Sequence, residues 1–131
     1  MLKNHFSQIS PSINTKLFGF MPEGDEVVCH TLSNRNGMEL SIINYGATIT
    51  SIKIPLSNGQ KVDVVLGFEN LEDYIKSFDL PSAPYFGSAV GRYAGRINNA
   101  SFILNGKRIQ VTKNHNSHQL HGGLVGFGQK F

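Results

Sequence analysis

The stretch from Pro84 to Phe127 reads PYFGSAVGRYAGRINNASFILNGKRIQVTKNHNSHQLHGGLVGF and carries most of the information on fold and function. At its centre Asn105-Gly106 is flanked by two strand-like runs. An Asn-Gly pair favours a type I′ hairpin because both of its residues must adopt positive φ. The hairpin lies between Arg96 and His121, which are twenty-five positions apart (121 − 96). We expect it to bring both side chains to one pocket, where they could bind a neutral ligand rich in hydroxyls.

Outward from this hairpin, alternating apolar residues and β-forming residues predict a series of strands. They are Phe18–Phe20, Val27–Leu32, Met38–Ile43, Ala47–Ile54, Lys61–Leu66, Ile97–Leu104 and Lys107–Thr112. The run Lys61–Leu66 is almost wholly apolar apart from Asp63, which predicts a buried strand. The segment Lys113–Gly128 is polar and rich in glycine, which predicts an irregular loop.

One short helix is predicted at Leu71–Phe78, because apolar residues recur there at spacings of three and four and Asn70 can cap it. The fold class is therefore all-β and mostly antiparallel, a sandwich rather than a closed barrel, with this one helix.

A length of 131 residues fits one domain or a piece of a larger one. We interpret residues 1–26 as an N-terminal arm and lead-in, since 1–18 show no period, and residues 27–131 as the domain.

Composition narrows the class of partner. The net charge is +3 and the isoelectric point is near 9.1, but the twelve Lys and Arg residues are scattered. Without a basic stripe we expect no nucleic-acid partner.

The single cysteine, Cys29, lies in the apolar run VVCHTL and is expected to be a buried thiol. No segment resembles a signal peptide or reaches membrane-spanning length, so we expect a cytoplasmic protein with no membrane partner.

Three histidines, His115, His118 and His121, are evenly spaced and raise the question of a metal site. A helix would place all three on one face, but Asn114, Asn116, Ser117 and the following glycines oppose a helix. On a strand, His118 would face away from the other two. We therefore expect no native metal site and no cofactor.

Arg96 and His121 each have an ordinary structural interpretation as well. Arg92 and Arg96 could pair with surface carboxylates, although Gly91 and Gly95 favour the close backbone approach of a pocket wall. A lone histidine is most often structural, but the two glycines after His121 would leave room for a ligand. For Arg96 the surface role and the site role both stay open on composition alone.

Several segments taken together resemble the N-terminal part of the aldose 1-epimerase (galactose mutarotase) family. They are NYGA at 44–47 followed by TITSIKIP, DVVLGF at 63–68, PYFG at 84–87, GRYAGRI at 91–97, LHGG at 120–123 and GF at 126–127. Their order and spacing both fit, and the resemblance runs from about Val27 to the end of the chain.

The resemblance implies an incomplete β-sandwich of the galactose mutarotase type. It also implies interconversion of the α and β anomers of aldohexoses such as galactose and glucose, by acid–base ring opening and closure without a cofactor. By position, Arg96 and Gly95 would bind the sugar, and His121 would bind it and assist catalysis. Gly95 departs from the asparagine that many members carry. The general-acid histidine and general-base glutamate of the family belong to its second half and have no match here.

We therefore expect an N-terminal fragment or truncated member of the family, inactive by itself and able to self-associate through uncovered strands. The alternatives are a non-catalytic carbohydrate-binding module and a relative of the hexose-6-phosphate epimerases, which would need additional basic residues around the pocket. A truncated gene product with no independent role is a further possibility.

Overall fold

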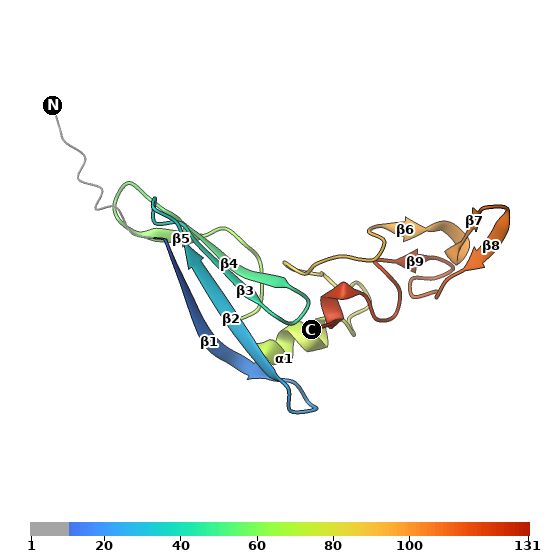
Figure 1. The fold of residues 1–131 in the computed structure, drawn as a ribbon, viewed down its shortest axis with the longest axis horizontal. Coiled ribbons are helices and arrows are strands. Elements are labelled where there is room, and N and C mark those ends of the chain that lie inside the picture. The colour runs from blue at the N-terminus through green and yellow to red at the C-terminus, as the bar shows by residue number, and fades with distance from the viewer. Residues whose placement is uncertain (1–10) are drawn as a thin grey trace. The chain divides into compact units, whose positions relative to one another are not determined.

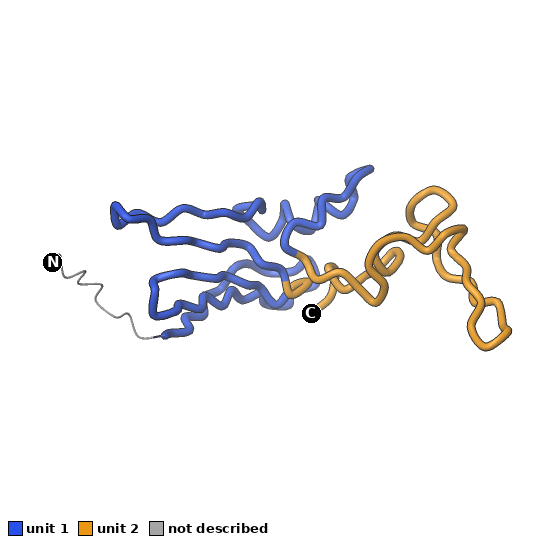
Figure 2. The backbone as a smooth tube through the Cα atoms, turned by 90° about the horizontal axis from the view of Figure 1, so that it is seen from above, with its two compact units in different colours: residues 1–44, 48–87 blue, residues 45–47, 88–131 orange. Residues whose placement is uncertain are grey.

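The structure is a computed structural model that describes residues 11–131. These residues form two compact units (Figure 2). The first unit comprises residues up to 44 and residues 48–87. The second unit comprises residues 45–47 and 88–131.

The first unit contains one antiparallel sheet in which each strand pairs with the next strand of the chain (Figure 1). Its strands are β1 (Ser12–Phe20), β2 (Glu26–Ser33), β3 (Glu39–Ile43), β4 (Thr48–Pro55) and β5 (Lys61–Asp63). Val27 and Cys29 of β2 and Ile43 of β3 are almost completely buried. The burial of Cys29 as a free thiol confirms the prediction made for it.

Helix α1 (Leu71–Ser77) confirms the one predicted helix and its cap. The Oδ1 atom of Asn70 accepts a hydrogen bond of 2.9 Å from the backbone N–H of Asp73, which satisfies a donor that the first turn leaves unpaired. Leu71 is buried against β1, where a Cβ atom added to Gly19 would lie 3.1 Å from the Leu71 side chain. Glycine in β1 thus lets the helix approach the sheet closely.

Aromatic rings complete the core of the first unit around Tyr74. Its ring lies 5.2 Å from that of Phe68 and 6.3 Å from that of Phe18, measured between centroids. The Tyr74 hydroxyl is buried and has no hydrogen-bond partner among the described residues. Burial raises the pKa of this hydroxyl.

The second unit contains two short antiparallel ribbons, β6 (Arg96–Ile97) with β9 (Gln119–Leu120), and β7 (Ser101–Leu104) with β8 (Lys107–Gln110). At the β7–β8 turn Asn105 has φ of 50° and Gly106 has φ of 75°. Positive φ at both central residues is the requirement of the predicted type I′ turn. Figure 1 shows both ribbons in the orange to red part of the colour scale.

The N-terminal arm needs a correction. Residues 12–20 form a full edge strand, β1, paired with β2 from Ser12↔Ser33 to Phe20↔Glu26, whereas only Phe18–Phe20 was predicted as strand. The segment has no clear alternation because most of its side chains are exposed on both faces. The proposed boundary at residue 27 stays a prediction, and residues 1–10 of the arm lie outside the described part of the chain.

The predicted buried strand Lys61–Leu66 is also wrong in length and burial. Strand β5 ends at Asp63, and its three residues are all exposed. The Asp63 carboxylate accepts hydrogen bonds from the Ser51 hydroxyl and from the backbone N–H groups of Ile52 and Val65. The Ile52 N–H thus donates to the Asp63 side chain and not to a backbone carbonyl of β5, and regular strand pairing ends at Asp63.

The predicted strand Ile97–Leu104 is two strands separated by a 3-10 turn at Asn98–Ala100. Asn99 and Ala100 both have positive φ, which a continuous strand does not allow. The predicted irregular loop contains the two-residue strand β9, which sequence patterns missed.

The fold class is confirmed as mostly antiparallel β with one α-helix. Among the described residues, no helix is both long enough and apolar enough to cross a membrane.

Candidate functional site

The β6–β9 ribbon pairs the segment that carries Arg96 with the segment that leads into His121. Arg96 pairs with Leu120, so His121 follows directly after the paired residue. The backbone N–H of His121 donates to the Gly95 carbonyl at 3.0 Å, and the backbone N–H of Gly95 donates to the His121 Nδ1 at 3.1 Å. Two reciprocal hydrogen bonds therefore fix the His121 ring next to the loop that carries Arg96.

The second of these bonds assigns the tautomer of His121. Because Nδ1 accepts the hydrogen bond, a neutral imidazole carries its proton on Nε2. The Nε2–H group is then a hydrogen-bond donor. The ring is half-buried, so its orientation is set by the protein backbone and not by solvent.

Two glycines that follow His121, Gly122 and Gly126, allow close approach of backbone segments. Gly122 has φ of 94°, and a Cβ atom added there would lie 1.8 Å from the Gly91 carbonyl oxygen. A Cβ atom at Gly126 would lie 2.5 Å from the His121 carbonyl oxygen. Both glycines allow two backbone segments to touch, which holds the LHGG loop against the GRYAGR loop.

Asn114 clamps the His121 loop, and sequence analysis did not single it out. Its Oδ1 accepts from the Leu120 N–H at 2.7 Å, and its Nδ2 donates to the carbonyl oxygens of Leu120 and Gly123, each at 2.9 Å. These bonds span the residues on both sides of His121. The only feature of the sequence that could have indicated this clamp is an asparagine six residues before Leu120 with a tight turn between them.

The three evenly spaced histidines each have a separate hydrogen-bond partner. The Arg96 guanidinium lies 3.4 Å from His115 Nε2, and His118 Nδ1 accepts from the Asn99 N–H at 3.2 Å. His121 is bound by Gly95 as described above. In the described part of the chain, no group of three His, Cys, Asp or Glu side chains could hold a metal ion.

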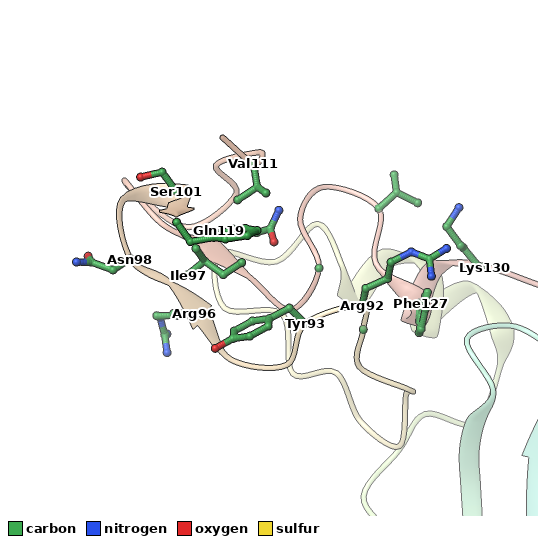
Figure 3. A pocket seen from close by; sticks show the side chains of 14 residues that line it. Arg92, Tyr93, Arg96, Ile97, Asn98, Ser101, Val111, Gln119, Phe127 and Lys130 are labelled. Carbon is green, nitrogen blue, oxygen red and sulfur yellow. The ribbon is translucent and has the colours of Figure 1, made fainter. Parts of the chain in front are cut away.

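A pocket of about 1040 Å³ lies within the second unit (Figure 3). Its lining comprises Gly91, Arg92, Tyr93, Arg96, Ile97, Asn98, Ser101, Phe102, Val111, Gln119, Gly122, Val125, Phe127 and Lys130. Of the three predicted site residues only Arg96 lines it, and the neighbour of His121, Gly122, does so as well. Three cations and no carboxylate line this pocket.

The family model for aldose 1-epimerase matches residues 28–131. The chain belongs to the aldose 1-epimerase family. Bovine galactose mutarotase is 37% identical over 116 residues, which cover 88% of this chain and 32% of that protein. The aldose 1-epimerase of Haemophilus influenzae is 40% identical over 102 residues, 78% of this chain and 28% of that protein. This family member therefore spans about a third of the length of the relatives it matches.

Solved structures give the same assignment. Galactose 1-epimerase from Lactobacillus acidophilus matches with a TM-score of 0.69 and 27% identity, over 88% of this chain and 31% of that one. A GalM/aldose epimerase homologue from C. elegans matches with a TM-score of 0.66 and 35% identity, over 75% and 29%. The resemblance found from the motifs is thereby confirmed, and the fold is that of part of a galactose epimerase.

Proposed function

We propose that this chain forms the sugar-binding part of an aldose 1-epimerase, which interconverts the α and β anomers of an aldohexose such as galactose or glucose. The observation that carries the proposal is the reciprocal pair of hydrogen bonds between Gly95 and His121. It orients the imidazole beside the backbone of Gly95, the residue before Arg96. A fixed ring donor and a guanidinium on the loop that holds this ring would suit the hydroxyl and ring oxygens of a pyranose.

Each residue has a distinct role in this proposal. Arg96 donates to sugar hydroxyls, and the His121 Nε2–H donates to the ring oxygen, whose negative charge grows as the ring opens. Gly95, with φ of 81°, allows the turn that presents its N–H to the imidazole. Proton transfer is the whole chemistry, so the proposed reaction uses no metal or cofactor.

The reaction also needs a general base to remove the anomeric hydroxyl proton. Residues 80–131 contain no aspartate or glutamate. The second unit therefore binds the sugar without supplying a carboxylate base, and we expect the chain alone to accelerate mutarotation very little. Polarimetry of freshly dissolved α-D-galactose measures this directly. A large acceleration that disappears in His121→Asn would contradict the expectation.

Sugar binding is tested by titrating the chain with galactose and with glucose while following the His121 ring signals by NMR. We expect the His121 signals to shift and Arg96→Gln to weaken binding about tenfold, because a hydrogen bond from a charged donor to a sugar hydroxyl is lost. Arg108→Gln is the matched control, since Arg108 does not line the pocket. Equal effects of the two substitutions would reject the assignment of Arg96.

Two other functions are separated by the same assays. A non-catalytic carbohydrate-binding module would bind galactose but would not accelerate mutarotation, whether the chain is alone or in a complex. A relative of the hexose-6-phosphate epimerases is favoured by the basic lining of Arg92, Arg96 and Lys130, and it would bind galactose 6-phosphate more tightly than galactose.

A cytoplasmic location is part of the proposal, because the lone buried thiol of Cys29 suits a reducing compartment.

A further inference from the structure

The chain contains three Asn-Gly pairs, and each lies in a turn between two strands: Asn36-Gly37, Asn58-Gly59 and Asn105-Gly106. Asparagine is a chemically labile residue. When glycine follows it, the glycine backbone nitrogen can attack the side-chain amide carbon, because no Cβ atom shields that nitrogen. The attacking nitrogen must first lose its proton. The hydrogen bond that each glycine N–H makes therefore decides which pair reacts.

The first two pairs lie at the end of their turns, where the glycine N–H closes the turn. The N–H of Gly37 donates to the Asn34 carbonyl oxygen at 3.1 Å, and the N–H of Gly59 donates to the Leu56 carbonyl oxygen at 3.0 Å. The Asn58 side chain is also held by two hydrogen bonds of its own. A reaction at either pair therefore has to break a backbone hydrogen bond first.

The third pair occupies the centre of its turn instead. This turn joins β7 to β8 (Figure 1), and it is closed by the strand pair Leu104↔Lys107. Among the described residues, none accepts a hydrogen bond from the Gly106 N–H and none is hydrogen-bonded to the Asn105 side chain. Both residues are exposed to solvent. The attacking nitrogen and the amide carbon of this pair are thus both accessible.

The charge around the third pair also favours the reaction. Loss of the amide proton of Gly106 to hydroxide leaves a negative charge on its nitrogen. Lys107 and Arg108 follow directly, and residues 80–131 contain no Asp or Glu. Positive charge close to the nitrogen stabilises the anion by Coulomb attraction, and no carboxylate in this part of the sequence opposes it.

We propose that Asn105 is a site of spontaneous deamidation and that it reacts faster than Asn36 and Asn58 in the folded chain. The Gly106 nitrogen forms a bond to the Asn105 Cγ atom and the Cγ–Nδ2 bond breaks. The side-chain nitrogen takes a proton from water and leaves as ammonia. A second water molecule then opens the five-membered succinimide ring at either carbonyl carbon, which gives aspartate or isoaspartate without oxidation or reduction.

The two products have opposite effects on the hairpin. Asp-Gly suits a type I′ turn as Asn-Gly does, so aspartate leaves β7 and β8 paired. It also places a carboxylate next to Lys107 and lowers the formal net charge of +3 by one. Isoaspartate adds a methylene carbon to the main chain. A two-residue turn cannot accommodate this extra carbon, so the Leu104↔Lys107 pair should open.

The test is ageing of the intact chain at mildly alkaline pH, followed by trypsin digestion and tandem mass spectrometry. Trypsin places the three pairs in separate peptides, residues 36–53, 54–61 and 97–107. Each deamidation raises the mass of its peptide by about one dalton. We expect Asn105 to react about tenfold faster than the other two pairs, the factor that corresponds to one backbone hydrogen bond.

The control is the same measurement in enough urea to unfold the chain, which removes the turn hydrogen bonds and keeps the sequence. The three pairs should then react at similar rates. Equal rates in the folded chain, a faster reaction at Asn36 or Asn58, or the same preference for Asn105 in urea would each overturn the proposal. Asn105 does not line the pocket, so the result is independent of the sugar chemistry proposed above.

Asn105→Asp supplies the reference for the two products. The aspartyl peptide of the aged chain should co-elute with the peptide of this variant, and a second product of the same mass is then the isoaspartyl form. Hydrogen exchange of the β8 amides should be unchanged in Asn105→Asp and faster in the isoaspartyl fraction. Equal exchange in both would overturn the placement of Asn105 at the centre of a two-residue turn, on which the proposal depends.

Discussion

His121 has φ of 50°, in the left-handed region, and Gly122 and Gly123 continue with φ of 94° and 97°. Three consecutive residues of this kind curl the chain so that the histidine ring turns toward the backbone of Gly95. For a residue with a side chain this conformation costs about 1–2 kcal/mol, which the hydrogen bonds to Gly95 and the Asn114 clamp offset. The site geometry is thus held by backbone contacts near the ring.

Gly122→Ala should destabilise the His121 loop strongly. The new Cβ atom would meet the Gly91 carbonyl oxygen and would also occupy a positive φ, so we expect a loss of about 3 kcal/mol or more. Gly106→Ala is the control, because Gly106 also has positive φ but open space around it; about 1 kcal/mol is expected there. Urea unfolding followed by the His121 ring signals measures both. Similar losses would show that the Gly91 contact is unimportant.

Asn114 links the turn at His115–His118 to strand β9, so its hydrogen bonds hold a whole element in place. Asn114→Ala removes three hydrogen bonds, so the free energy of local opening at Leu120 should fall by about 1–3 kcal/mol. Hydrogen exchange of the Leu120 amide reports this opening. Asn116→Gly, in the same turn and at positive φ, should leave the Leu120 amide protected. Unchanged protection in Asn114→Ala would contradict the clamp.

The end of β5 should be sensitive to acid. The Ser51 hydroxyl, together with the backbone N–H groups of Ile52 and Val65, holds the pKa of Asp63 below its ordinary value of about 3.8. A lowered pKa in the folded state stabilises that state above the unfolded-state value, and the stabilisation is lost as pH falls through the folded-state value. We therefore expect the Val65 amide to lose protection below about pH 3.8.

An NMR pH series checks this expectation, with Asp63→Asn as the control, since an amide does not titrate. Ser51→Ala should raise the pKa of Asp63 toward its ordinary value, because the hydroxyl is the largest cause of the lowering. A wild-type Val65 amide that is equally protected at pH 2.5 and pH 5 would contradict the role given to the carboxylate.

Elements whose cause is local were predictable from the sequence. The Asn105-Gly106 turn and the Asn70 cap depend on residues within one turn of each other, and the structure has both. Strand β1 depends on pairing with β2. The early end of β5 depends on the Ser51 hydroxyl, which is also distant in sequence. In the site, the Arg96 and His121 motifs were recognisable, but the Asn114 clamp joins side chain to backbone across six residues and leaves no period in the sequence.

At the scale of the whole molecule, the two units differ in charge. Acidic residues occur only in the first, which also has the exposed edge strand β1 with Ile13 and Leu17 largely in solvent. An exposed apolar edge is a template for pairing with another strand. Self-association by this edge is our expectation for the chain without a partner.

Leu17→Lys should reduce self-association, because a lysine on an edge strand opposes pairing by charge and by its hydration. Leu80→Lys is the control: Leu80 is 53% exposed, close to the 52% of Leu17, but lies outside the sheet. Sedimentation velocity over a tenfold concentration range measures the effect. A concentration-independent monomer for the unsubstituted chain would remove the basis for the prediction.

The confinement of acidic residues to the first part of the chain has a practical consequence. A protease that cleaves only after aspartate or glutamate has its last target at Asp79. Digestion would cut the sheet-bearing part into fragments and release residues 80–131 as one uncut peptide. That peptide contains Gly95, Arg96 and His121 of the proposed sugar site, so mass spectrometry of a digest could follow all three through a single product.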